Sequence, residues 1–226
     1  MIYEMALTDV NGVDIVAKTI NYRRTAGRGS VYVASNYYRW RRMRARRWIK
    51  PGSISAVLTE TKFVPALLAV NKQINSEGIN YLYGQDFVFE EAVALQQFLA
   101  IIGPQNQQRL ISIELMSWAK RGFSKAAQYG AFTLLAGATN LQSFVLSDTL
   151  DKYTAKVDII ARHFFKEAHQ FMEAYGRANG GRDAVVEIIE LDDDNFDPGN
   201  FYKIKPTSLE DGQAKFGAAL RRLLSA

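Results

Sequence analysis

The chain has 226 residues, of which 28 are Lys or Arg and 23 are Asp or Glu, so its formal net charge is +5. It contains no Cys, which excludes disulfide bonds, thiolate zinc sites, iron–sulfur clusters and cysteine nucleophiles. No run of about 18 apolar residues occurs, and Glu4 stands where a signal peptide carries positive charge. These features predict an intracellular protein, nuclear or cytoplasmic, that forms a single domain over residues 1–226 and needs no metal or cofactor to fold.

The charge is unevenly distributed along the chain. Residues 1–50 contain 11 basic and three acidic residues, a net charge of +8, which leaves −3 for the other 176 residues. The domain therefore divides into an N-terminal part, residues 1–62, with a basic arm, and a mildly acidic α/β body, residues 63–226. Such asymmetry indicates an anionic partner, or pairing of the arm with the body of the same chain.

The N-terminal part contains signals for a helix and a hairpin. Residues 1–7 are expected to form a short helix, and the pair Asn11-Gly12 is a turn signal. The alternation of residues 13–22 predicts a strand, which a turn at residues 27–30 connects to a second strand at residues 31–33. An Arg-rich stretch follows over residues 36–50 and ends at a Pro-Gly-Ser sequence.

Strand and helix patterns alternate through the body. Short apolar strands are expected at residues 87–89, 111–116, 141–146 and 185–191. Helices are expected at residues 64–84, 90–102, 124–138, 156–178 and 208–224. The predicted fold class is α/β: a short, mainly parallel sheet of about four strands alternating with helices, similar to a degenerate leucine-rich repeat, with an N-terminal β-hairpin and an Arg-rich arm.

Two segments resemble a known family. The first is Met1-Ile2-Tyr3-Glu4-Met5-Ala6-Leu7, and the second is Val70-Asn71-Lys72-Gln73-Ile74-Asn75-Ser76-Glu77, followed by Tyr83-Gly84 and Phe87-Val88-Phe89. Together they resemble the fungal F-box-like proteins of unknown function, over residues 1–10 and 62–147. The resemblance implies an intracellular α/β protein that acts by protein–protein contact. In true F-box proteins a three-helix element docks on the adaptor of cullin ubiquitin ligases, and here the leucine-proline segment that opens that element is missing.

The Arg-rich stretch is the strongest candidate for a binding site. Arg contacts phosphates through a planar fork, and aromatic rings stack on exposed bases. The predicted nucleic-acid or polyanion contacts are Arg39, Trp40, Arg41, Arg42, Arg44, Arg46, Arg47 and Trp48. Two other interpretations stay open: a nuclear localisation signal read by a receptor, and a loop that pairs with the acidic body.

Other polar clusters give weaker signals. The aspartates at positions 192, 193, 194 and 197 have oxygen ligands suited to Mg²⁺ or Ca²⁺, but a solvated turn is the favoured interpretation. His163 and His169 are six residues apart on one expected helix. Because two metal ligands on a helix need a spacing of three or four residues, this pair does not predict a metal site. Asn71 and Glu77 are expected to fix neighbouring backbone by buried hydrogen bonds.

The sequence thus predicts a non-enzymatic, intracellular binding module without catalytic residues, metal or cofactor. Its expected partner is anionic, most simply a nucleic acid bound through the Arg-rich arm. The alternative is an F-box-like scaffold for protein interaction or for target recognition in a ubiquitin ligase, with the Arg-rich stretch as a nuclear localisation signal. No membrane partner is expected, because the stretch lacks a broad apolar face.

Overall fold

A computed structural model describes residues 2–9, 12–20, 23–28, 64–116, 125–147, 157–191 and 209–225. One sheet of six strands runs through them in the order β2-β1-β3-β4-β5-β6. Its strands are β1 (Val13–Ile20), β2 (Arg23–Arg28), β3 (Asp86–Phe89), β4 (Ser112–Leu115), β5 (Ser143–Leu146) and β6 (Ile189–Leu191). The helices are α1 (Ile2–Leu7), the 3₁₀ helix η1 (Pro65–Ala69), α3 (Lys72–Tyr83), α4 (Ala92–Gln107), α5 (Lys125–Leu135), α6 (Val157–Ala178), α7 (Ala184–Ile188) and α8 (Leu209–Leu224).

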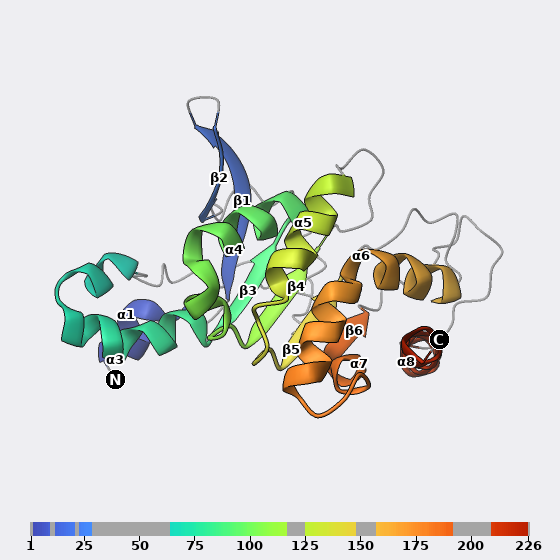
Figure 1. The fold of residues 1–226 in the computed structure, drawn as a ribbon. Coiled ribbons are helices and arrows are strands. Elements are labelled where there is room, and N and C mark those ends of the chain that lie inside the picture. The colour runs from blue at the N-terminus through green and yellow to red at the C-terminus, as the bar shows by residue number, and fades with distance from the viewer. Residues whose placement is uncertain are drawn as a thin grey trace, which may run out of the picture.

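The predicted α/β class is confirmed. Strands β1, β3, β4, β5 and β6 run parallel to one another, and only β2 runs antiparallel to its neighbour β1. Because the spatial order follows the chain order, right-handed connections place successive helices on the same face of the sheet. Figure 1 shows α4, α5 and α6 side by side over that face, which we call the inner face.

The core lies between the inner face and these helices. Alternate strand residues point into it, and they are buried: Phe87, Phe89, Ile113, Leu115, Phe144, Leu146, Ile189 and Leu191. The ring centroid of Phe144 on β5 lies 6.2 Å from that of Phe132 on α5 and 5.8 Å from that of Phe171 on α6. Aromatic packing therefore fixes α5 and α6 over the centre of the sheet.

The hairpin differs from its prediction in two ways. Its second strand is Arg23–Arg28, so residues 27 and 28, which were expected in a turn, belong to a strand, and the strand expected at residues 31–33 lies outside the described residues. Arg is a poor predictor of strands but is common at sheet edges, where charge discourages pairing with other chains. The hairpin also joins the main sheet, because Val13–Ile15 pair with Phe87–Phe89 while the rest of the hairpin extends beyond the sheet (Figure 1).

Two helical predictions also change. The helix expected over residues 64–84 is broken at Asn71, whose backbone is extended and whose side chain accepts a hydrogen bond from the Ile74 N–H at 2.8 Å. Asn71 is thus the N-cap of a new helix.

The strand expected at 185–191 begins as the helix α7, because Val185 and Val186 are both buried and a strand cannot bury two consecutive side chains on one face. The break expected after residue 102 is confirmed at Gly103, with φ of 72°.

Candidate interaction surface

The face of the sheet opposite α4, α5 and α6, which we call the outer face, presents a row of alternating acidic and aliphatic side chains. Cross-strand pairing joins Asp14 to Val88, Val88 to Glu114, Glu114 to Val145 and Val145 to Glu190. We call these five residues the carboxylate row. Residues paired across neighbouring strands share a face, so all five belong to the outer face.

The carboxylates of this row have a regular spacing. Neighbouring strands are about 4.8 Å apart, so acidic positions on every second strand are about 9.6 Å apart, with a valine between them. Val88 is only 2% exposed, whereas Glu190 at the end of the row is exposed. The Ser147 hydroxyl donates a hydrogen bond of 3.3 Å to Glu114 Oε1. A second cross-strand set on this face consists of Asp86, Ser112 and Ser143.

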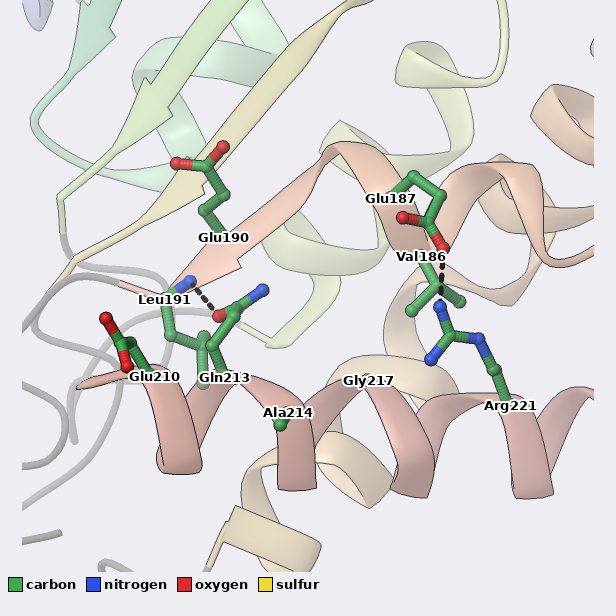
Figure 2. Close-up of a pocket in the computed structure, with 9 residues that line it drawn as sticks. All are labelled: Val186, Glu187, Glu190, Leu191, Glu210, Gln213, Ala214, Gly217 and Arg221. Atoms are coloured by element: carbon green, nitrogen blue, oxygen red, sulfur yellow. Dashed lines mark hydrogen bonds and ion pairs between the residues drawn. The ribbon is translucent and has the colours of Figure 1, made fainter. Parts of the chain in front are cut away.

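A groove of about 500 Å³ lies where the row reaches the edge of the sheet, between α7 and β6 on one side and α8 on the other (Figure 2). The Val186 and Leu191 side chains form part of its wall, and Ala214 and Gly217 are its small α8 residues. Three carboxylates and one guanidinium also line it: Glu187, Glu190, Glu210 and Arg221. Arg221 forms an ion pair with Glu187.

Gln213 occupies the hydrogen-bonding edge of β6. Its Oε1 accepts from the Leu191 N–H at 3.0 Å, and its Nε2 donates to the Ile189 carbonyl at 2.7 Å. The amide side chain thus takes the place of a neighbouring strand. Because these two backbone groups are used, another chain cannot pair with them in a ladder.

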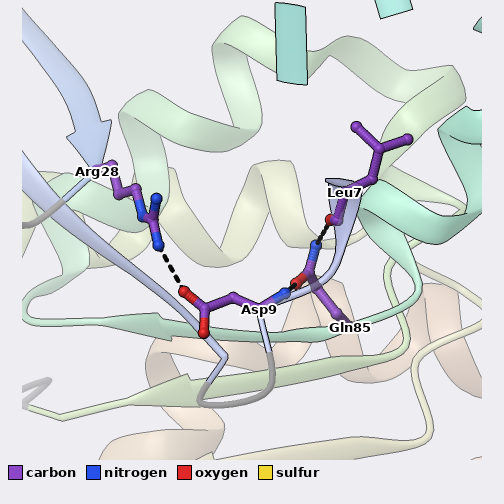
Figure 3. A network of polar contacts seen from close by, with 4 residues as sticks. All are labelled: Leu7, Asp9, Arg28 and Gln85. Carbon is purple, nitrogen blue, oxygen red and sulfur yellow. Dashed lines mark hydrogen bonds and ion pairs between the residues drawn. The ribbon is translucent and has the colours of Figure 1, made fainter. Parts of the chain in front are cut away.

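The helices α1, η1 and α3 form a second surface beside the sheet, which we call the helical unit. Gln85 is 7% exposed and joins this unit to the sheet: it accepts from the Asp9 N–H at 2.8 Å and donates to the carbonyls of Leu7 at 2.8 Å and Leu82 at 2.7 Å (Figure 3). Arg28 of β2 forms an ion pair of 2.5 Å with the nearly buried Asp9.

A tyrosine and a glutamate tie α1 to α3 at the surface. The Tyr3 hydroxyl donates to Glu77 Oε2 at 2.7 Å, and Gln73 donates to Glu77 Oε1 at 2.9 Å. These hydrogen bonds lower the pKa of Glu77, and the bond to Glu77 raises the pKa of Tyr3. Asn71 therefore fixes neighbouring backbone as expected, but from an exposed position. Glu77 is also exposed, and its hydrogen bonds are to the side chains of Tyr3 and Gln73 and not to the backbone as expected.

The helical unit also exposes apolar side chains. Val64 is 44% exposed, Val70 64% and Tyr81 43%. No residue of η1 is buried.

The residues predicted as binding site from the sequence, Arg39, Trp40, Arg41, Arg42, Arg44, Arg46, Arg47 and Trp48, lie outside the described residues, as do the aspartates 192–194 and 197. His163 and His169 are both exposed on α6. Within the described ranges no three His, Asp or Glu side chains come close enough together to hold a metal ion. The helices of these ranges include none with the length and apolar character needed to cross a membrane.

The sequence analysis missed the carboxylate row, although the signal was present. In the strand sequences ISIELM, LQSFVL and IIEL, the residue between two buried apolar positions is Glu114, Val145 and Glu190 in turn. Aligning the strands by their buried positions would have placed the three on one face. The groove was not predictable in this way, because it depends on how α8 lies against β6.

No family model, no curated protein and no solved structure matches this chain. The resemblance to fungal F-box-like proteins therefore stays a prediction from the quoted sequence segments.

Proposed function

We propose that this protein is a non-enzymatic binding module that recognises another protein through the outer face of its sheet. The observation that carries this proposal is the carboxylate row, in which acidic and aliphatic positions alternate across five parallel strands. In parallel α/β sheets both faces are usually covered by helices and the strands are apolar throughout. A polar outer face departs from that pattern, as a surface used for recognition does.

The composition of the row favours a protein partner over a nucleic acid at this face. Carboxylates repel phosphates, whereas they pair with Lys and Arg of a protein. Val145, which is half-buried, adds apolar contact area, and protein interfaces combine such area with a polar rim. The exposed apolar residues of the helical unit supply a second surface for protein contact, consistent with the scaffold role that the family resemblance implies.

A comparison of variants on the two faces tests the proposal. The face variant replaces Val145 and Glu190 with Lys, and the matched control replaces Gln170 and Glu173 with Lys on α6, which covers the other face of the sheet, so both variants raise the net charge by three. Affinity purification followed by quantitative mass spectrometry should recover proteins with the wild type and the control that the face variant loses. Each such protein is then purified and titrated directly. Equal recovery and equal direct affinity for the face variant would contradict the proposal.

A second candidate function follows from the Arg-rich stretch, whose six Arg and one Lys between residues 36 and 50 include no acid between them. We infer that this stretch binds nucleic acid, independently of the outer face. Seven phosphate contacts predict that the logarithm of affinity falls with log salt with a slope of roughly −6. Fluorescence anisotropy with labelled DNA and RNA should show this slope. A variant with Ser in place of Arg39, Arg41, Arg42, Arg44, Arg46 and Arg47 should lose the binding, and undiminished affinity would favour the localisation-signal interpretation.

A further inference from the structure

The shape of the groove follows from one stripe of α8. Glu210, Gln213, Ala214, Gly217 and Arg221 recur at intervals of three and four residues, so they share one side of the helix. The middle of this stripe is small, since Ala214 ends at Cβ and Gly217 has no side chain. A space therefore remains between the α8 backbone and the side chains of α7 and β6 (Figure 2).

The two ends of the groove differ in charge. At one end, Arg221 neutralises Glu187 in an ion pair. At the other end stand Glu190 and Glu210, both exposed, and within the described part of the chain neither has an ion-pair partner. Figure 2 shows the Glu210 carboxylate beside Leu191 and the Glu190 side chain extending from β6 on the side away from α8. The groove therefore combines an aliphatic middle with one end of negative charge.

We propose that the groove is a subsite for a Lys or Arg side chain of the partner protein, which rests on the proposed function of the outer face. The aliphatic stem of such a side chain packs against the exposed Ala214, since Val186 and Leu191 are already buried, while its charged head pairs with Glu190 and Glu210. Glu190 belongs both to the groove and to the carboxylate row, so the occupant of the groove continues onto the outer face.

The backbone groups at the edge of β6 are already hydrogen-bonded, which favours a partner that binds through a side chain over one that adds a strand. A partner that bound by adding a strand would need the Leu191 N–H and the Ile189 carbonyl, and Gln213 already satisfies both. The repeat of the row gives a further criterion. Acidic positions about 9.6 Å apart match basic side chains three residues apart on a chain in the polyproline II conformation, which has three residues per turn and therefore repeats about every 9.3 Å on one side.

The probe for this proposal is a fluorescein-labelled peptide, Gly-Lys-Ser-Ser-Lys-Ser-Ser-Lys-Gly, titrated by anisotropy against the full chain. A peptide with norleucine in place of Lys keeps the aliphatic stems and removes the charges. The subsite predicts that the Lys peptide binds and the norleucine peptide does not. Absence of binding by the Lys peptide at near-physiological salt would overturn the subsite, while the partner comparison on Val145 and Glu190 would still test the proposed function separately.

Two groove variants and one control localise the binding. Replacing Glu190 and Glu210 with Gln removes the charge, and Ala214→Trp fills the groove without changing charge at an exposed helix position. Each should weaken binding about tenfold. The control, Glu173→Gln with Asp211→Asn, changes the net charge by the same amount outside the groove and should bind as the wild type does. Equal loss in the control, or undiminished binding by Ala214→Trp, would contradict the subsite.

The Arg-rich stretch of the same chain is the competing occupant. The test is a variant in which Ser replaces the six arginines Arg39, Arg41, Arg42, Arg44, Arg46 and Arg47. If this variant bound the peptide about tenfold more tightly than the wild type, the groove would be a site for this chain's own basic stretch, and the partner subsite would be refuted. Equal affinity supports the partner. Far-UV circular dichroism of every variant confirms that it is folded before its affinity is interpreted.

Discussion

Gln85 should be the polar residue whose loss most weakens the connection between the helical unit and the sheet. Gln85→Met nearly preserves the side-chain volume, so packing changes little. The substitution removes three hydrogen bonds, to the Asp9 N–H and to the carbonyls of Leu7 and Leu82. A neutral hydrogen bond contributes about 0.5–1.5 kcal/mol, and a buried group left without a partner costs more. We expect the free energy of unfolding to fall by about 2–4 kcal/mol.

Urea unfolding followed by far-UV circular dichroism measures this loss. The midpoint should fall without a change in the denaturant slope, which would show that stability and not compactness has changed. In a thermal scan the same loss corresponds to about 5–15 °C in Tm for a chain of this size.

Gln73→Met is the matched control. Gln73 is exposed on α3 and donates one hydrogen bond to Glu77. An exposed substitution of this kind should change stability by no more than about 0.5 kcal/mol. If Gln85→Met cost no more than Gln73→Met, the three hydrogen bonds would not stabilise the junction, and the reasoning would be wrong.

Two further predictions concern a hydrogen bond of the helical unit and a glycine of α8. Tyr3→Phe removes the hydrogen bond to Glu77, and the loss of stability that it causes should be largest near neutral pH. On the acid side the loss should shrink as pH falls below 4.5, the ordinary pKa of Glu, and through the lowered pKa of Glu77. On the basic side it should shrink as pH rises above 10.0, the ordinary pKa of Tyr, and through the raised pKa of Tyr3. A difference between wild type and variant that does not change with pH, measured by urea unfolding, would refute the ion-assisted bond. Gly217→Ala should stabilise the protein by about 0.5–1 kcal/mol through helix propensity, because the new Cβ lies 3.4 Å from Val186 Cγ1. Gly78→Ala should give no such gain, because its Cβ would lie 2.8 Å from a Leu68 methyl, and equal Tm increases would contradict the packing argument.

The sequence was a good guide wherever one short pattern determines one element. The strands β4 and β5 place buried apolar residues at alternate positions, β3 is a run of three buried apolar residues, and the amphipathic α6 keeps one apolar side over 22 residues. Prediction was wrong where a longer-range contact decides the outcome. Val185-Val186 has the composition of a strand, and only burial of both side chains makes it helical.

The candidate site was less predictable than the fold. The carboxylate row requires the register of β1, β3, β4, β5 and β6, which no local pattern states. The groove requires the position of α8, which follows from packing against α6 and α7. Gln213 is an ordinary polar residue in the sequence, and its role appears only when Leu191 and Ile189 are seen at the edge of the sheet.

The match between chain order and strand order has a consequence for how this architecture can change. Each strand–helix unit between β3 and β6 contacts mainly the units before and after it, so stability is built from nearest-neighbour interfaces, as in a repeat array. An array of this kind can lengthen by duplication of a unit at its end. At β6 the Gln213 amide occupies the hydrogen-bonding groups at that end of the array. If another strand–helix unit replaced the segment that carries Gln213, the array would gain one more strand and a longer recognition face.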